Sequence, residues 1–309
     1  MRAKIMLLYG SAQEEMLCSL SEEILTEVSA AFHHSFSLMR ESISASSRED
    51  DPEILTDKTI EACQQCQAIL LCTGSQKCAQ ELYDALNLPL RIRSFCIPHA
   101  LCSRHESPVS FWLAQALSVD SDTVRIAMEY AFRFARESDA KVTHVAPAGA
   151  SKAEWDGAVR VQEVNHPYLS SSSLSAPDAI RAIITAPNHL GVMICPPYAG
   201  SILNEAAAAL CPHPFMMHDT AFDDTIGVYS PVLPLDEQEI RPFSCALSIA
   251  HMMRFSLGLA REAACIEAAV NNVLSAHPQI DGIDIQGLVA LICEQIAVAG
   301  ELMERVGIS

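Results

Sequence analysis

The sequence predicts an α/β protein with two domains. Short apolar runs alternate with helical segments over the first hundred residues, as they do in sheets whose strands are joined by helical crossovers. The 309 residues can bury a sizeable core, and their number favours two domains. Half of the residues are apolar and 19% are charged, which is typical of a globular chain and not of a disordered one.

Strands are expected at short runs of apolar residues, and helices where apolar residues recur with helical spacing. The clearest helix is 120–137, where Asp120 or Ser121 is a natural N-cap. Residues 97–110, 170–173 and 216–224 are predicted as loop. The predicted strands are 4–9, 36–44, 68–72, 89–95, 141–145, 161–164, 191–194 and 226–232. The predicted helices are 11–31, 57–67, 80–88, 151–159, 177–184, 199–209, 243–255, 261–276 and 285–299, besides 120–137.

The segment 190–209, LGVMICPPYAGSILNEAAAA, reads as a buried strand, a break at two prolines, and a helix. Such strand–turn–helix units place ligands at the carboxyl end of the strand. Ser201 and Glu205 are four residues apart and therefore share one face of the helix. Two carboxylates at this spacing would suit a divalent cation, but here one of the two is a hydroxyl.

The formal charge of −18 argues against a nucleic acid partner, because Lys and Arg supply the affinity for phosphates. It equally disfavours anionic membrane surfaces. We expect no membrane span, since no uninterrupted apolar run approaches about 20 residues. The twelve cysteines lack close pairing and fit buried thiols in a reducing cytoplasm. The turn after the first strand, GSAQEE, has one glycine, so neither a dinucleotide-binding GxGxxG nor a P-loop is present.

Several segments, in this order, resemble one known family. They are LTDKTIEACQQCQAILL, LNLPLRIRS, DSDTVRIAMEYAFRFARESDAKVTHV, AGSILNEAA and MMRFSLGLAREAACIEAAVNNVL. Their order is similar to that in the β-decarboxylating dehydrogenases of isopropylmalate and isocitrate, and most of all to the 3-isopropylmalate type. The resemblance implies a discontinuous large α/β domain, 1–95 with 228–309, and a small α/β domain, 96–227, that carries the dimer helices.

The resemblance also implies a chemistry. Members of the family are dimers that use a nicotinamide cofactor, NAD in the isopropylmalate type, and Mg²⁺ or Mn²⁺ to oxidise and decarboxylate a 2-hydroxy acid. Arginines hold the substrate carboxylates, the cation stabilises the developing enolate, and a lysine and a tyrosine move protons.

Carried over position by position, the resemblance leaves an incomplete site. Arg93 matches one substrate arginine and Arg104 stands for another, while a third position is Tyr83. Of the metal-binding set there remain Ser201 and Glu205, with Asp178 near the position of a partner-supplied aspartate. The segment that carries the family's tyrosine is largely deleted.

The proton-transfer and cofactor elements are changed as well. Pro147 occupies the place of the family's lysine. Segment 230–242, SPVLPLDEQEIRP, lacks the glycines, histidine and asparagine of the family's adenosine-binding loop, and its three acidic residues would repel a phosphate.

The candidate site residues could also have ordinary structural roles. Arg93 either holds an anion or pairs with an acid, and Glu205 is either a cation ligand or a helix-dipole partner. His213 and His218, with Cys211 and Asp219 nearby, would form a metal site only if loop geometry brought them together.

The sequence therefore predicts a member of this family that has lost metal-dependent oxidative decarboxylation and acts as a binding, regulatory or structural protein. We expect a homodimer, or a heteromer with an active paralogue, and a small anionic ligand. The alternative is an active NAD(P)-dependent dehydrogenase with a rebuilt site that uses Arg93, Arg104, Asp178 and Glu205.

Overall fold

The chain forms two compact units, Met1–Asn87 with Asp224–Ser309, and Leu88–Asp223. The computed structural model describes residues 1–43, 55–73, 75–97, 109–147, 149–209, 216–232, 242–277 and 283–306. Strand β4 (Leu90–Ile97), which the sequence analysis assigned to the large domain, lies in the second unit.

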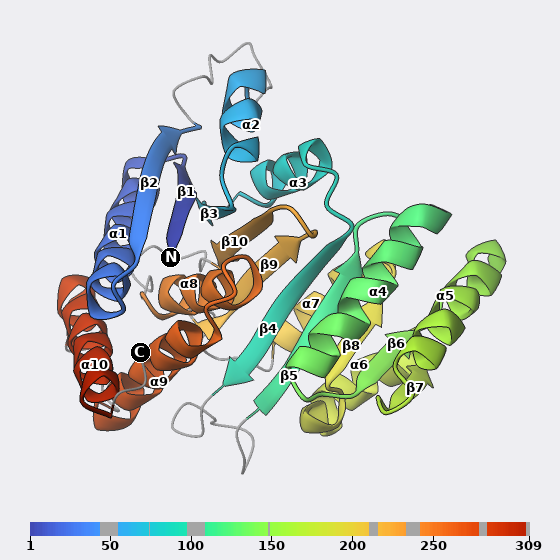
Figure 1. The fold of residues 1–309 in the computed structure, drawn as a ribbon. Helices are drawn as coiled ribbons and strands as arrows, with labels where there is room; N and C mark the ends of the chain where they lie inside the picture. The colour runs from blue at the N-terminus through green and yellow to red at the C-terminus, as the bar shows by residue number, and fades with distance from the viewer. Residues whose placement is uncertain are drawn as a thin grey trace. The chain divides into compact units, whose positions relative to one another are not determined.

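The first unit is a parallel sheet with the strand order β2-β1-β3-β10, covered by helices (Figure 1). Its strands are β1 (Arg2–Tyr9), β2 (Ser35–Ser42), β3 (Ala68–Cys72) and β10 (Gly227–Pro231). Its helices are α1 (Ala12–Ala31), α2 (Asp57–Gln64), α3 (Gln76–Ala85), α8 (Phe243–Phe255), α9 (Ala260–Ala276) and α10 (Ile285–Val306).

The core of this unit lies where α1 and α8 pack on the central strands. β3 is buried along its whole length and reads AILLC, because a parallel strand covered on both faces has no polar side. Eleven residues of α8 are buried, which explains why its sequence is apolar around most of its circumference.

α10 is the one described helix that is long and apolar enough to cross a membrane, over Ile285–Met303, a stretch of 19 residues with a mean hydropathy of 1.5. The sequence analysis predicted a helix over 285–299 but no membrane span, because Glu294 interrupts the apolar run. In the structure α10 packs against α1 and α9. Gly300 lies so close to α1 that an added Cβ would stand 2.8 Å from the Ala31 carbonyl oxygen.

The second unit is a mixed sheet with the strand order β9-β4-β5-β8-β6-β7, in which β4 runs antiparallel to β5 and β9 (Figure 1). Its strands are β4 (Leu90–Ile97), β5 (Val109–Ala116), β6 (Val142–Val145), β7 (Ser171–Leu174), β8 (Val192–Cys195) and β9 (His218–Phe222). Its helices are α4 (Ser121–Glu137), α5 (Lys152–Asn165), α6 (Ala176–Thr185) and α7 (Pro197–Ala208), with short 3-10 turns at Gly149–Ser151 and Pro187–His189.

Helices pack in pairs on this sheet. α4 lies on β5 and β8 and contacts α5, whereas α7 lies on β5 and contacts α6. The buried side of α4 carries Met128, Phe132 and Phe134, at the helical spacing expected from the sequence. Asp120 accepts a hydrogen bond from the Thr123 backbone N–H (2.9 Å) and is the N-cap of the helix, as predicted.

Four sequence-based assignments were wrong. β5 lies in a stretch for which no strand was predicted, although five of the six residues Phe111–Ala116 are apolar and the strand is central in the sheet. β7 is a serine-rich edge strand and β9 contains His218 and Asp219, so neither shows the apolar pattern of a strand. Residues 161–164, predicted as a strand, continue α5, because nothing before Pro167 interrupts that helix.

Candidate functional site

The main cluster of charged and polar side chains in the second unit follows one face of β4. Arg91 and Arg93 are two residues apart and therefore point to the same side of the sheet. Gln115 of β5 is the register partner of Arg91, and Asp219 of β9 is the register partner of Arg93. We call these four residues the β4 polar row. It brings together three strands that are far apart in the sequence.

Arg93 and Asp219 form a buried bidentate ion pair. Arg93 Nε lies 2.7 Å from Asp219 Oδ1 and Nη2 lies 2.6 Å from Oδ2, and each residue is 7% exposed. Burial alone would raise the pKa of Asp219, but the adjacent Arg93 guanidinium outweighs it and holds that pKa below its ordinary value. Arg93, predicted as an anion holder, thus already binds a carboxylate of its own chain.

Arg91 is in a different situation. It is half-buried, and its Nη2 donates to Gln115 Oε1 at 2.6 Å. Among the described residues it forms no ion pair with a carboxylate. A guanidinium has five N–H donors, so most of the donors of Arg91 remain available to an anion. The sequence analysis had not singled out Arg91, although its spacing from Arg93 was a usable signal.

Gln115 connects this row to α7. Its Nε2 donates to the Pro197 carbonyl oxygen (2.9 Å), and Asn204 Nδ2 lies 3.5 Å from its Oε1. A Cβ at Gly200 would stand 2.4 Å from Gln115 Cδ, so the close approach of α7 to β5 requires glycine at this position. The start of α7 is therefore fixed against the β4 polar row.

Ser201 and Glu205 lie elsewhere on α7. The face that packs on the sheet is formed by Gly200, Leu203 and Asn204, whereas Ser201 and Glu205 are exposed. With 100° between successive residues, these two project away from Gln115 and Arg91. The structure thus places the two residues on one face of the helix, as expected, but does not bring them to the arginines.

Asp178 is engaged locally at the start of α6. It is exposed, accepts from Ser175 Oγ (2.6 Å) and lies 3.3 Å from Arg181 Nη1, while Ser175 caps the helix by accepting from the Asp178 N–H. Helix capping accounts for this pair without a cation. Arg104 lies outside the described residues, as does most of segment 230–242.

The described part of the chain contains no group of three or more His, Cys, Asp or Glu side chains that could hold a metal ion. Of the histidine cluster, His213 and Cys211 lie outside the described ranges. His218 is buried in β9, and burial lowers its pKa to about 4, so its imidazole is neutral near pH 7.

The turn after β1 is occupied by a side chain of the protein. Glu14 Oε2 accepts from the backbone N–H groups of Gly10 and Ser11, both at 2.8 Å, and Glu14 Oε1 accepts from Thr73 Oγ1 at 2.7 Å. Ser11 caps α1 in return, through the Glu14 N–H. Backbone donors that could bind a phosphate at this helix start are thus taken by a carboxylate.

Two further matched positions are buried. Pro147 follows β6 and is buried, and its side chain has no group that donates or accepts a proton. Tyr83, at the position of a family arginine, is 1% exposed on α3 and belongs to the core. Neither position supplies a charged side chain.

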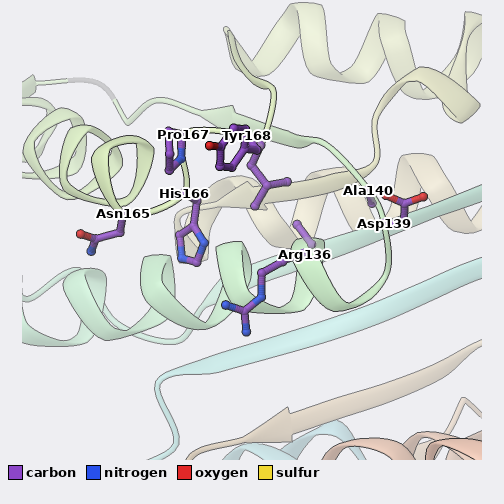
Figure 2. A pocket seen from close by; sticks show the side chains of 9 residues that line it. Arg136, Asp139, Ala140, Asn165, His166, Pro167 and Tyr168 are labelled. Carbon is purple, nitrogen blue, oxygen red and sulfur yellow. The ribbon is translucent and has the colours of Figure 1, made fainter.

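A hollow of about 410 Å³ lies between the ends of α4 and α5. Figure 2 shows Arg136 and Asp139 at the end of α4, and His166, Pro167 and Tyr168 on the turn after α5. Arg136 Nη2 lies 3.7 Å from Glu137 Oε1. The hollow contains none of the residues that the sequence analysis selected, and its polar groups do not define one ligand chemistry.

Comparison with known proteins gives a consistent result. Residues 113–299, more than half of the chain, match the family model described as isocitrate/isopropylmalate dehydrogenase. The 3-isopropylmalate dehydrogenase of Syntrophotalea carbinolica is 28% identical over 165 residues, 51% of this chain and 45% of that protein. The enzyme of the same name from Oceanobacillus iheyensis is 23% identical over 89% of this chain and 88% of that protein. The first of these alignments thus spans less than half of the relative.

Solved structures show the same fold. Isocitrate dehydrogenase from Methylococcus capsulatus superposes with a TM-score of 0.79 at 16% identity, covering 95% of this chain and 99% of that one. The TT0538 protein from Thermus thermophilus gives a TM-score of 0.80 at 13% identity, covering 95% of this chain and 68% of that one. At such identities the likeness concerns the fold alone.

Proposed function

The chain belongs to the isocitrate/isopropylmalate dehydrogenase family, and from this premise we propose that it has kept the fold of the family but not its metal-dependent oxidative decarboxylation. Its role is then to bind a small anionic ligand as a regulatory or structural homologue of the active enzymes.

One observation carries the proposal. Pro147 stands where the resemblance puts the lysine that transfers a proton, two residues after β6 in a well-matched segment, and it is buried. Proline offers no titratable group, so no change of environment can restore general acid–base catalysis at this position.

Two other features support it. The Glu14 carboxylate occupies the donors of the first turn, so a cofactor phosphate placed there would meet a negative charge at the helix start. Ser201 and Glu205 supply one carboxylate in place of two, and Asp178 is engaged by Ser175 and Arg181. If Mg²⁺ or Mn²⁺ binds at all, these three residues are a poor ligand set for it.

The test is turnover. The purified full chain is assayed for nicotinamide reduction with isopropylmalate, isocitrate, malate and tartrate, each with NAD and NADP and with Mg²⁺ and Mn²⁺. We expect no rate above that without enzyme, while the 3-isopropylmalate dehydrogenase of Oceanobacillus iheyensis, run in parallel, is active. Turnover on any of these substrates, or saturable NAD binding in a thermal-shift assay, would favour the rebuilt dehydrogenase and overturn the proposal.

We place the anionic ligand at Arg91, because its guanidinium is half-buried, donates to the neutral Gln115 amide and, among the described residues, lies within ion-pair distance of no carboxylate. Malate is a suitable dicarboxylate probe. Arg91→Gln should weaken malate binding, measured by calorimetry, by about tenfold, the loss expected for one charge-assisted hydrogen bond. Arg125→Gln, which removes an exposed arginine from α4, should leave the affinity unchanged. Equal affinities in the two variants would remove Arg91 from the site.

The assembly is proposed as a homodimer that buries the exposed face of α7. Tyr198 and Ile202 on this face are 55% and 60% exposed, and Ile184 of the neighbouring α6 is 52% exposed. Exposed apolar side chains on adjacent helices are typical of an interface. Co-purification with an active paralogue from the source cell would instead indicate a heteromer.

A further inference from the structure

Six polar side chains converge at the amino-terminal ends of β2, β1 and β3. They line a hollow of about 390 Å³, and apart from Ala3 no other described residue contributes to its wall. They comprise two cations, two hydroxyls and two amides, and no carboxylate is among them. The six are Arg2, Lys4, Ser35, Ser37, Gln65 and Gln67.

The strand register brings these side chains together. β1 and β2 are parallel, with Arg2 opposite Ser35 and Lys4 opposite Ser37. Residues two apart on a strand share a face, so Arg2 and Lys4 project to the same side as the two serines. Neighbouring strands are about 4.8 Å apart and same-face residues about 7 Å apart, so the donors surround an area of the size of a small anion.

Gln67 is fixed in this arrangement. Its Oε1 accepts from the Lys4 backbone N–H at 2.6 Å, and its own backbone N–H donates to the Lys4 carbonyl oxygen at 3.0 Å. With the oxygen engaged by the backbone, the amide NH₂ of Gln67 is the group left to donate. The side chains of Arg2, Lys4, Ser35 and Ser37 make no hydrogen bond or ion pair to any described residue.

The charge contrast gives the site its chemical preference. The chain has 38 acidic and 20 basic residues, and a formal charge of −18. Among the described residues Arg2 and Lys4 form no ion pair, and no acid lines the hollow, so it would attract anions that the rest of this acidic protein repels.

We propose that this hollow, at Arg2, Lys4, Ser35 and Ser37, binds the phosphate group of a small phosphomonoester. The two cations, the hydroxyls and the amides offer more hydrogen-bond donors than the two oxygens of one carboxylate can accept. A phosphate dianion accepts hydrogen bonds at three oxygens and is the better match. The volume exceeds that of a phosphate ion, and the polar wall suits an organic part that carries hydroxyl groups, as in a polyol phosphate.

The experiment is calorimetric titration of the full chain at low ionic strength. The probes are glycerol 3-phosphate, inorganic phosphate and glycerol. We expect saturable binding of glycerol 3-phosphate that is tighter than that of phosphate, weakens with added salt, and is absent with glycerol. Equal affinity for the two anions would show that the hollow recognises the phosphate group alone, and the proposed ligand would then be free phosphate and not a phosphomonoester. No saturable heat with either anion would overturn the site.

Variants locate the binding. Arg2→Gln combined with Lys4→Gln should weaken glycerol 3-phosphate binding by about tenfold or more, because two charge-assisted contacts are lost. Ser37→Glu, which adds a carboxylate to the hollow, should do the same independently. Lys58→Gln removes an exposed cation of α2 and should bind glycerol 3-phosphate as the native chain does. Equal weakening by Lys58→Gln and by the Arg2 and Lys4 double change would overturn the assignment.

Discussion

Asp219 and Arg93 form a buried ion pair inside the second unit, so removal of either charge leaves the other buried without this partner. We predict that Asp219→Asn lowers the free energy of unfolding by about 3–5 kcal/mol near neutral pH. The measurement is urea unfolding. The control is Asp122→Asn in the exposed first turn of α4, for which we expect a loss of about 0.5 kcal/mol.

The same pair gives a pH dependence with a defined sign. Because the pKa of Asp219 is lower in the folded chain than its unfolded value of about 3.9, its stabilisation is complete above that value. It is lost as pH falls through the folded pKa. The difference in unfolding free energy between the native chain and Asp219→Asn should therefore shrink below about pH 4. A difference that stayed constant down to acid unfolding would contradict this account.

Gly200 offers a second residue-level prediction. Gly200→Ala forces a methyl group against Gln115, and we expect a loss of about 1–3 kcal/mol in the free energy of unfolding. Gly157→Ala is the matched control in an exposed helix position where a Cβ meets nothing within 4 Å, and it should stabilise by about 0.5–1 kcal/mol. Similar effects at both glycines would show that helix propensity, not packing, governs position 200.

Residue roles were only partly accessible from the sequence. The residue types on 89–95 indicated an anion-binding strand, but Arg93 finds its acid 126 positions away, on a strand that had been predicted as loop. Without the register of β9 against β4, nothing distinguishes Arg93, which is paired with Asp219, from Arg91, which donates a hydrogen bond to the Gln115 amide. In the same way, no local pattern shows that Glu14 reaches Thr73 on another strand end.

At the scale of elements, the start of α1 depends on one carboxylate that accepts three hydrogen bonds. We predict that Glu14→Ala lowers the free energy of unfolding by about 1–2 kcal/mol, the range of a lost helix cap. Glu15→Ala is the control, because Glu15 makes only an exposed contact to Arg40 at 3.6 Å, and it should cost at most about 0.5 kcal/mol. Thermal melting, followed by circular dichroism, should give a lower melting temperature for Glu14→Ala than for Glu15→Ala. Equal melting temperatures would show that the turn does not need the Glu14 carboxylate.

Elements with a strong periodic or wholly apolar pattern were predicted well. α8 was placed at its observed bounds, as was β3, because burial on all sides leaves a continuous apolar run. β7 and β9 were missed for the opposite reason: an edge strand of serines and a strand that buries an ion pair carry no apolar signature. Pairing with neighbours, a tertiary effect, stabilises them.

At the scale of the whole molecule, packing and catalysis depend on different residues, so a fold can be kept while the residues of its site change. The buried strands and helices of both units are retained at 13–16% identity to solved structures. Pro147, Tyr83 and Glu14 each satisfy local packing or hydrogen bonding, which explains how the fold remains stable with these changes. The resemblance predicted this architecture. Only the structure shows which polar groups form hydrogen bonds or ion pairs within the chain.

The proposed dimer is a property of the whole molecule, and it can be tested by substitutions on the exposed face of α7. A stable interface buries about 1,000 Å² or more in total, so a dimer must cover Ile202 together with apolar neighbours such as Tyr198 and Ile184. Ile202→Glu places a charge at the centre of that face and should convert the dimer to a monomer, measured by sedimentation equilibrium. Val161→Glu introduces the same charge at a 53% exposed position of α5 and should leave the dimer intact. A native chain that sediments as a monomer, or dissociation caused by Val161→Glu and not by Ile202→Glu, would show that α7 is not the interface.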